Sequence, residues 1–231
     1  MNQVLVTGAN RGIGLELTRQ CLQRGDRVFA ACRSPQEAVE LQALEAGYEQ
    51  LTLLQMDVTI PDSLKAARQA VETLTPSLNL LFNNAGIGSG GETITSVRLQ
   101  DLLQALEVNA IAPVMVVKEF YDLLRVGKSP RVVNISSEAG SLARARSGRG
   151  YSYQGSKAAL NMYTRALAFD RNMRGILVIA MHPGWARTDM GGSMAPLSAA
   201  ESAQGILQVV DGLTEADTGK FYTYDGREHA W

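Results

Sequence analysis

The segment TGANRGIG, residues 7–14, places three glycines directly after the apolar run of residues 4–6. A strand that runs into such a turn leaves backbone N–H groups free at the start of the following helix, where phosphate binds well. Glycine also adopts positive φ and lets the backbone approach a ligand closely. The segment therefore predicts a nucleotide-binding turn, although an ordinary glycine-rich turn between a strand and a helix would give the same pattern G-x-x-x-G-x-G.

The rest of the chain alternates short β-rich runs with helical patterns. The runs predict seven strands, at residues 4–7, 27–32, 51–58, 78–84, 131–136, 176–182 and 220–224. Helical patterns fill the intervals, at residues 12–24, 35–46, 61–74, 95–126, 152–171 and 196–213. Several strands are apolar throughout, as buried parallel strands are. We predict the α/β class: a single doubly wound Rossmann domain over residues 1–231, with about seven parallel strands and helices on both faces.

The composition argues against several classes of protein. The chain is 45% hydrophobic, enough for a sizeable core, and 22 Lys plus Arg nearly balance 23 Asp plus Glu. We therefore expect no nucleic acid and no membrane as partners. We recognise no signal peptide or membrane-spanning run and expect a cytoplasmic protein. Cys21 and Cys32 lack a CxxC spacing, so we expect neither a disulfide framework nor a metal site.

Tyr153 and Lys157 are four residues apart in a strong helical pattern, so their side chains share one face of the helix. A tyrosine transfers protons poorly near neutral pH, but an adjacent ammonium lowers the pKa of its phenol. The pair therefore predicts a tuned proton donor. An isolated YxxxK is more often a surface lysine beside a half-buried tyrosine.

Further motifs follow in a fixed order: NNAG at 83–86, Asn109, VVNISS at 132–137, YQGSK at 153–157 and HPG at 182–184. Together with TGANRGIG, they closely resemble the short-chain dehydrogenase/reductase family over essentially the whole chain. The stretches SYQGSKAALNM, HPGWARTDMGG and FYTYDGREHAW resemble its small C-factor-like and sniffer-like carbonyl reductases. The resemblance implies an NADP(H)-dependent oxidoreductase that reduces a ketone or aldehyde to the alcohol. The alternative is a dinucleotide-binding regulatory or signalling protein of the C-factor type, with incidental catalysis.

The resemblance also implies four catalytic residues. Tyr153 would protonate the carbonyl oxygen as hydride arrives, and Lys157 would bind the nicotinamide ribose and lower the pKa of Tyr153. Ser137 would hydrogen-bond the substrate oxygen, whereas Ser136 would pack or bond to backbone. Asn109 would hold a water that links Lys157 to solvent in a proton relay.

Pro113 gives a physical reason to look at Asn109. It follows Asn109 by four residues in a helical pattern and lacks the N–H that the Asn109 carbonyl would otherwise accept from. We therefore expect a kinked helix whose freed carbonyl binds water. A kink with a capped carbonyl predicts the same sequence.

The end of the second predicted strand indicates NADP(H) rather than NAD(H). NAD-specific enzymes carry an acidic residue there, whereas arginine accommodates a 2′-phosphate. Arg33 occupies this position, and Arg11 in the glycine turn supplies a second cation. An Arg33 that merely faces solvent is the alternative. The cofactor contacts implied by the turn and the resemblance are Gly8, Asn10, Arg11, Gly12, Ile13, Gly14, Arg33, Asp57, Val58, Asn84, Ala85, Gly86, Tyr153, Lys157, Pro183, Gly184 and Thr188.

Two loops bear on the substrate. Residues 141–150, SLARARSGRG, lengthen the interval from Ser137 to Tyr153 to sixteen residues, more than is commonest in the family. Their arginines, Arg144, Arg146 and Arg149, would favour an acidic substrate if the loop borders the entrance, although a solvated loop is the commoner role. The Met- and Gly-rich residues 190–194 predict an adaptable loop that accepts small or varied carbonyl compounds.

Two predicted helices, around residues 114–124 and 158–169, carry apolar residues on more than one face and need covering on both sides. In the family that the chain resembles, these helices pair across a dimer. We therefore expect a homodimer or homotetramer.

Overall fold

Apolar runs along the chain form the strands of one parallel sheet. The computed structural model describes residues 1–231 and contains a seven-stranded sheet in the order β3-β2-β1-β4-β5-β6-β9. Every neighbouring pair in it is parallel. The strands are β1 (Gln3–Thr7), β2 (Arg27–Cys32), β3 (Leu51–Gln55), β4 (Leu80–Asn83), β5 (Arg131–Ile135), β6 (Leu177–His182) and β9 (Phe221–Thr223). The predicted fold class is confirmed.

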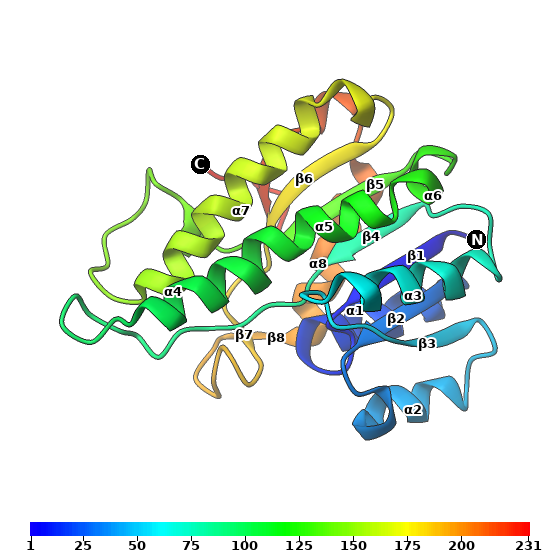
Figure 1. Ribbon diagram of the computed structural model, residues 1–231, viewed down its shortest axis with the longest axis horizontal. Helices are drawn as coiled ribbons and strands as arrows, with labels where there is room; N and C mark the ends of the chain where they lie inside the picture. The colour runs from blue at the N-terminus through cyan, green and yellow to red at the C-terminus, as the bar shows by residue number, and fades with distance from the viewer.

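Helices follow the strands in turn. They are α1 (Gly12–Gln23), α2 (Val39–Glu45), α3 (Pro61–Glu72), α4 (Leu99–Leu106), α5 (Ala112–Glu119), α6 (Tyr121–Arg125), α7 (Tyr151–Phe169) and α8 (Ala199–Gly212). In Figure 1, α3, α5 and α7 lie in front of the sheet, whereas α1 and α8 lie behind it. No helix is both long and apolar enough to cross a membrane.

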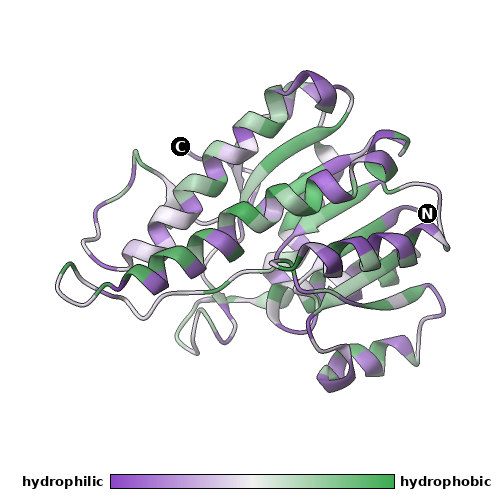
Figure 2. Ribbon diagram, in the orientation of Figure 1, coloured by the Kyte–Doolittle hydropathy of each residue, from purple (hydrophilic) through white to green (hydrophobic).

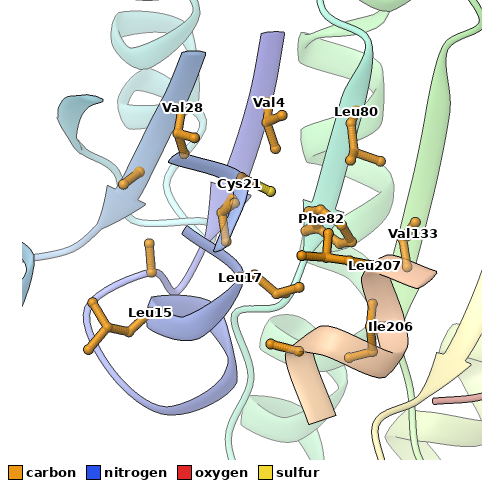
Figure 3. Close-up of a cluster of buried hydrophobic side chains, with 14 of the residues drawn as sticks. Val4, Leu15, Leu17, Cys21, Val28, Leu80, Phe82, Val133, Ile206 and Leu207 are labelled. Atoms are coloured by element: carbon orange, nitrogen blue, oxygen red, sulfur yellow. The ribbon is translucent and has the colours of Figure 1, made fainter. Parts of the chain in front are cut away.

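Alternation along the strands divides the core between the two faces of the sheet. Val4 and Val6 belong to a cluster of 26 buried residues with α1, α2 and α8, while Leu5 belongs to a cluster of 19 with α3, α5 and α6. Successive side chains of a strand point to opposite faces, so one apolar run serves both clusters. Figure 3 shows the first cluster, in which Leu17 and Leu207 meet Phe82. Figure 2 shows hydrophobic residues concentrated in the sheet and hydrophilic residues on the outer faces of the helices.

The long helical segment predicted at residues 95–126 is interrupted in the structure. A π-helical turn, Glu107–Ile111, separates α4 from α5, and the Ala112 N–H donates to the Glu107 carbonyl. Pro113 supplies no N–H, so the regular α-helical ladder cannot continue through this point. The expected irregularity at Asn109 is therefore a widened turn.

Some segments are shorter than predicted or were not predicted. The strand expected at 51–58 ends at Gln55, because Asp57 and Thr59 form a hydrogen-bonded turn. The strands β7 (Ala186–Arg187) and β8 (Leu197–Ser198) pair in a small separate sheet and are too short to leave a periodic pattern in the sequence.

The sheet topology fixes where a ligand can bind. The chain runs from β1 outward through β2 to β3, then returns to β4 and continues outward through β5 and β6 to β9. The order therefore reverses between β1 and β4, and in open α/β sheets ligands bind beyond the carboxyl ends of the strands at this point.

Candidate active site

The glycine turn begins where β1 ends and is held by the segment after β4. The Asn84 side chain donates to the carbonyls of Thr7 (3.0 Å) and Gly8 (3.1 Å), and the Thr7 hydroxyl accepts from the N–H groups of Asn84 and Ala85. Gly8 and Gly12 have φ of 65° and 56°, the left-handed region that glycine tolerates. The predicted turn is thus fixed at the switch point.

The start of α1 suits a phosphate group. No side chain caps this helix, and its first turn carries no acidic residue. A Cβ on Gly14 would lie 2.3 Å from the Gly8 carbonyl oxygen, so only glycine allows the turn to fold this tightly. Ile13 packs against the hydrophobic cluster below, whereas Asn10 and Arg11 are exposed. Free N–H groups at a helix start bind anions, so the residues present fit the pyrophosphate of a dinucleotide.

The two cations expected near the adenosine end differ in their surroundings. Arg33 follows β2, is exposed and forms no ion pair. Arg11 is paired with Asp189, with 2.6 Å between Nη1 and Oδ2. Arg33 is therefore the freer of the two guanidinium groups, and the role of Arg11 stays a prediction.

Asp57 and Val58 follow β3, as predicted. The Asp57 carboxylate accepts from the Thr59 N–H (2.9 Å) and the Thr59 hydroxyl (2.7 Å) through one oxygen, Oδ1. Val58 packs against the hydrophobic cluster on the α3 side. Nothing in their contacts ties either residue to the catalytic group, so their place at the adenine stays a prediction.

Lys157 is buried beside the carboxyl end of β5. Its Nζ donates to the Ile135 carbonyl at 2.8 Å and lies 5.8 Å from the centroid of the Tyr153 ring. Burial lowers the pKa of Lys157 to about 8. The amine therefore remains mostly protonated at neutral pH.

The structure corrects one expectation about Tyr153. We expected Lys157 to lower the pKa of this phenol. Burial instead raises the pKa of Tyr153, and a hydrogen bond with the Ser137 side chain lowers it by less. Lys157 is buried and Tyr153 half-buried, and desolvation disfavours the charged form of each. A phenol in this state holds its proton at neutral pH.

The two serines after β5 have different partners. Ser137 is half-buried, and its Oγ accepts from the Ala139 N–H at 3.1 Å, which leaves its own proton available to Tyr153 or to a ligand. Ser136 is buried and donates to the Asn161 side chain at 2.6 Å, rather than to backbone. Only Ser137 faces the phenol.

Asn109 joins the π-helical turn to the loop after β4. Its side chain accepts from the Ile87 N–H (2.8 Å), donates to the Ile87 carbonyl (2.9 Å) and donates to Ser156 (3.0 Å). A Cβ on Gly86 would lie 3.1 Å from Asn109 Oδ1 and 3.7 Å from Lys157 Nζ. Asn109, Gly86 and Lys157 are therefore packed together at one point.

The segment after β6 closes the site on the α1 side. A Cβ on Gly12 would lie 3.1 Å from Thr188 Cγ2, which places this predicted cofactor residue over the glycine turn. Gly184 has φ 78° and approaches Tyr224 and Leu197 closely. The Pro183 carbonyl accepts from Ser202 at 2.6 Å, which anchors the segment to α8.

Two contributors to this site were not predicted from the sequence. Ser156 accepts from Asn109 and donates to the Tyr153 carbonyl at 2.8 Å, so it links two predicted catalytic residues. The Ile135 carbonyl receives the Lys157 ammonium. Ser156 lies inside the YQGSK motif, directly before Lys157, which was the available signal. A backbone acceptor leaves no signal in sequence.

A doubly wound sheet with a glycine turn, and with a half-buried Tyr153 beside a buried Lys157 at its carboxyl edge, defines a class, the dinucleotide-dependent oxidoreductases. Residues 2–197 match the family described as short chain dehydrogenase. The chain therefore belongs to the short-chain dehydrogenase family.

Several known proteins resemble the chain over most of its length. A carbonyl reductase from chicken fatty liver, solved with NADPH bound, is 39% identical, with a TM-score of 0.93 and coverage of 100% of this chain and 99% of that one. The carbonyl reductase Sniffer of D. melanogaster is 36% identical, with a TM-score of 0.96 and full coverage of both chains. The C-signal protein of Myxococcus xanthus is 38% identical over 162 residues, 70% of this chain and 98% of its own length.

The burial of Lys157 predicts a pH-dependent effect on stability. Its folded pKa of about 8 lies below its ordinary value of 10.5, so the unfolded chain binds more protons between these pH values. Burying the charged amine therefore costs free energy below pH 8, and this cost disappears as the pH rises to 10.5. From neutral pH to the upper end of this window, the free energy of unfolding of wild type should therefore gain about 3 kcal/mol from this residue, and that of Lys157→Met should not. The value for Lys157→Met minus that for wild type should fall by the same amount.

Urea unfolding at a series of pH values measures this difference, with Lys118→Met, at an exposed position of α5, as the matched control. A difference for Lys157→Met that does not change with pH would mean that the amine is not desolvated in the folded protein.

Proposed function

We propose that the protein is an NADPH-dependent carbonyl reductase that converts a small or varied ketone or aldehyde to its alcohol. One observation carries the proposal. The Tyr153 phenol, the Ser137 hydroxyl and the Lys157 ammonium are gathered at the carboxyl edge of the sheet, beside the glycine turn and the loop held by Asn109.

The hydroxyl groups supply the polar contacts that a carbonyl oxygen requires. Bound NADPH supplies the hydride. Ser137 has its oxygen engaged by the Ala139 N–H, so its proton can be donated to the substrate oxygen. Burial favours the neutral phenol of Tyr153, which holds its proton at neutral pH and donates that proton as charge develops on the same oxygen. A protonated phenol suits the direction of reduction.

Lys157 and Asn109 assist proton transfer from Tyr153. The ammonium has three N–H donors, and the bond to Ile135 uses one. Although burial raises the pKa of Tyr153 on balance, the ammonium lies 5.8 Å from the centroid of the ring, and its positive charge would offset part of that cost as the phenolate forms. The remaining donors can bind the nicotinamide ribose, and a water held at Asn109 would return a proton from solvent.

The preference for NADPH rests on Arg33. An exposed guanidinium without a carboxylate partner follows β2, where an NAD-dependent enzyme would carry an acid. The chicken carbonyl reductase, which resembles the chain over its whole length, was solved with NADPH bound.

Replacing the proton donor tests the proposal. We expect Tyr153→Phe to lose about 100-fold or more in kcat for carbonyl reduction, because the general acid is removed. NADPH binding should persist, since the glycine turn is unchanged. NADPH oxidation followed by absorbance, with a panel of aldehydes, quinones, diketones and ketosteroids, measures the first quantity, and quenching of protein fluorescence measures the second.

The outcomes separate the two functions that we considered. A variant as active as wild type would remove Tyr153 from the mechanism. NADPH binding without turnover of any compound by wild type would favour a dinucleotide-binding regulatory protein, the role suggested by the C-signal relative.

The cofactor preference is tested at Arg33. Arg33→Ala should reduce the ratio of kcat/KM for NADPH over NADH by about tenfold or more, because a charge-assisted hydrogen bond to the 2′-phosphate is lost. Activity with NADH should stay near the wild-type value. An unchanged ratio would mean that Arg33 faces solvent and that another group reads the phosphate.

The helices expected to pair across a dimer were those around residues 114–124 and 158–169, but residues 114–124 expose no large hydrophobic side chain. We propose instead a homodimer through α4 and α7. The exposed apolar residues Leu99 and Leu103 lie on α4, and Met162 and Phe169 lie on the neighbouring α7. Light scattering at micromolar concentration should give twice the chain mass, or four times for a tetramer. Met162→Glu should shift the mass toward the monomer, whereas a wild-type monomer would contradict the assembly.

A further inference from the structure

We infer that the site takes a carbonyl compound that carries a carboxylate, and that Arg144, Arg146 and Arg149 recognise it. The inference rests on the proposed function and names its substrate class.

Residues 139–169 contain four arginines, one lysine and no aspartate or glutamate, although the whole chain has a net charge of −1. The three arginines of the inference lie within six consecutive residues of the loop 141–150. All three side chains are exposed, and none forms an ion pair. The loop therefore presents a local positive charge that the protein itself does not neutralise.

The loop borders the catalytic group at both ends. It begins four residues after Ser137 and ends three residues before Tyr153. A Cβ on Gly150, at the end of the loop, would lie 3.0 Å from Ser89 Oγ, and a Cβ on Gly88 would lie 3.2 Å from Met190 Cγ. Residues 88–89 therefore lie beside both this loop and the Met-rich loop 190–194. We call the surface that these three segments form the mouth of the site.

Four hydrogen bonds fix the ends of the loop. At its start, the Ser141 hydroxyl donates to the Ala230 carbonyl at 2.7 Å, and the Ala143 N–H donates to the Trp231 carbonyl at 2.9 Å. At its end, the Gly150 N–H donates to the Glu92 carbonyl at 2.8 Å, and the Ser152 N–H donates to the Glu92 carboxylate at 2.7 Å. The three arginines are thus carried on a short span between two anchors.

Two nearby carboxylates, Glu92 and Asp189, are already engaged, whereas Glu138, which follows Ser137, is exposed and forms no ion pair. Hydrogen bonds from Ser152 hold the pKa of Glu92 below its usual value, and Asp189 is paired with Arg11. Neither carboxylate forms an ion pair with the arginines of the loop. Guanidinium groups bind carboxylates through paired hydrogen bonds, and a cluster of cations at a cleft attracts anions from solution. A substrate with a carboxylate remote from its carbonyl group would satisfy both ends of the site.

The test compares 4-carboxybenzaldehyde with its neutral ester, methyl 4-formylbenzoate, which presents the same aldehyde on a ring of similar shape. We expect the triple variant R144Q/R146Q/R149Q to lower the ratio of kcat/KM for the acid over the ester by about tenfold at low ionic strength, because three exposed charge contacts are lost. The ester kcat/KM and the KM for NADPH should remain within about twofold of wild type.

The matched control removes three exposed cations from the other edge of the sheet. Lys128, Arg171 and Arg174 precede β5 and β6, so K128Q/R171Q/R174Q changes the net charge equally and should leave the ratio unchanged. A second measurement uses wild type alone: added NaCl should lower the acid-over-ester ratio, because surface charges are screened.

The outcomes distinguish this inference from the function on which it rests. An unchanged ratio in R144Q/R146Q/R149Q, or a wild-type ratio insensitive to NaCl, with ester turnover intact, overturns the inference and leaves the reductase in place. An equal fall in the control variant also overturns it, since net charge alone would then explain the effect. Failure of wild type to reduce either aldehyde overturns the inference, and failure to reduce any compound of the panel as well removes the proposed function with it.

Discussion

The structure depends on burying one ammonium group at the carboxyl edge of a parallel sheet. Lys157 is 5% exposed, and its Nζ has one protein acceptor, the Ile135 carbonyl. A buried charge requires such partners and a fixed position. Gly86 leaves room above the amine, and Asn109 fixes the loop that carries Gly86. The position of the Tyr153 ring and the protonation states of both groups follow from this packing.

The fold provides that position because elements distant in sequence end at one edge. Ile135 closes β5, Lys157 lies on the helix that follows it, and Gly86 lies after β4, the strand paired with β5. Asn84 ties the same loop to the glycine turn after β1. The nucleotide turn and the proton donor are therefore held in one hydrogen-bonded framework, and the loops at the mouth can vary around it.

Local patterns predicted much of this arrangement. Apolar runs located the strands, and the four-residue spacing placed Tyr153 and Lys157 on one helix face. Features that arise from tertiary packing were not predicted. The Arg11–Asp189 pair joins residues 178 positions apart, and the acceptor for Lys157 is a backbone carbonyl. The pKa of Tyr153 was predicted in the wrong direction, because the spacing reveals the neighbouring lysine but not the desolvation of the phenol.

The central claim is that these residues support hydride transfer from NADPH to a carbonyl carbon. The most direct measurement uses the two epimers of NADPH deuterated at C4 of the nicotinamide, with methyl 4-formylbenzoate and wild-type protein. Mass spectrometry should find deuterium on the carbinol carbon of the product with one epimer, and no labelled product with Tyr153→Phe under the same conditions. Binding of both epimers without label in any product would contradict the account.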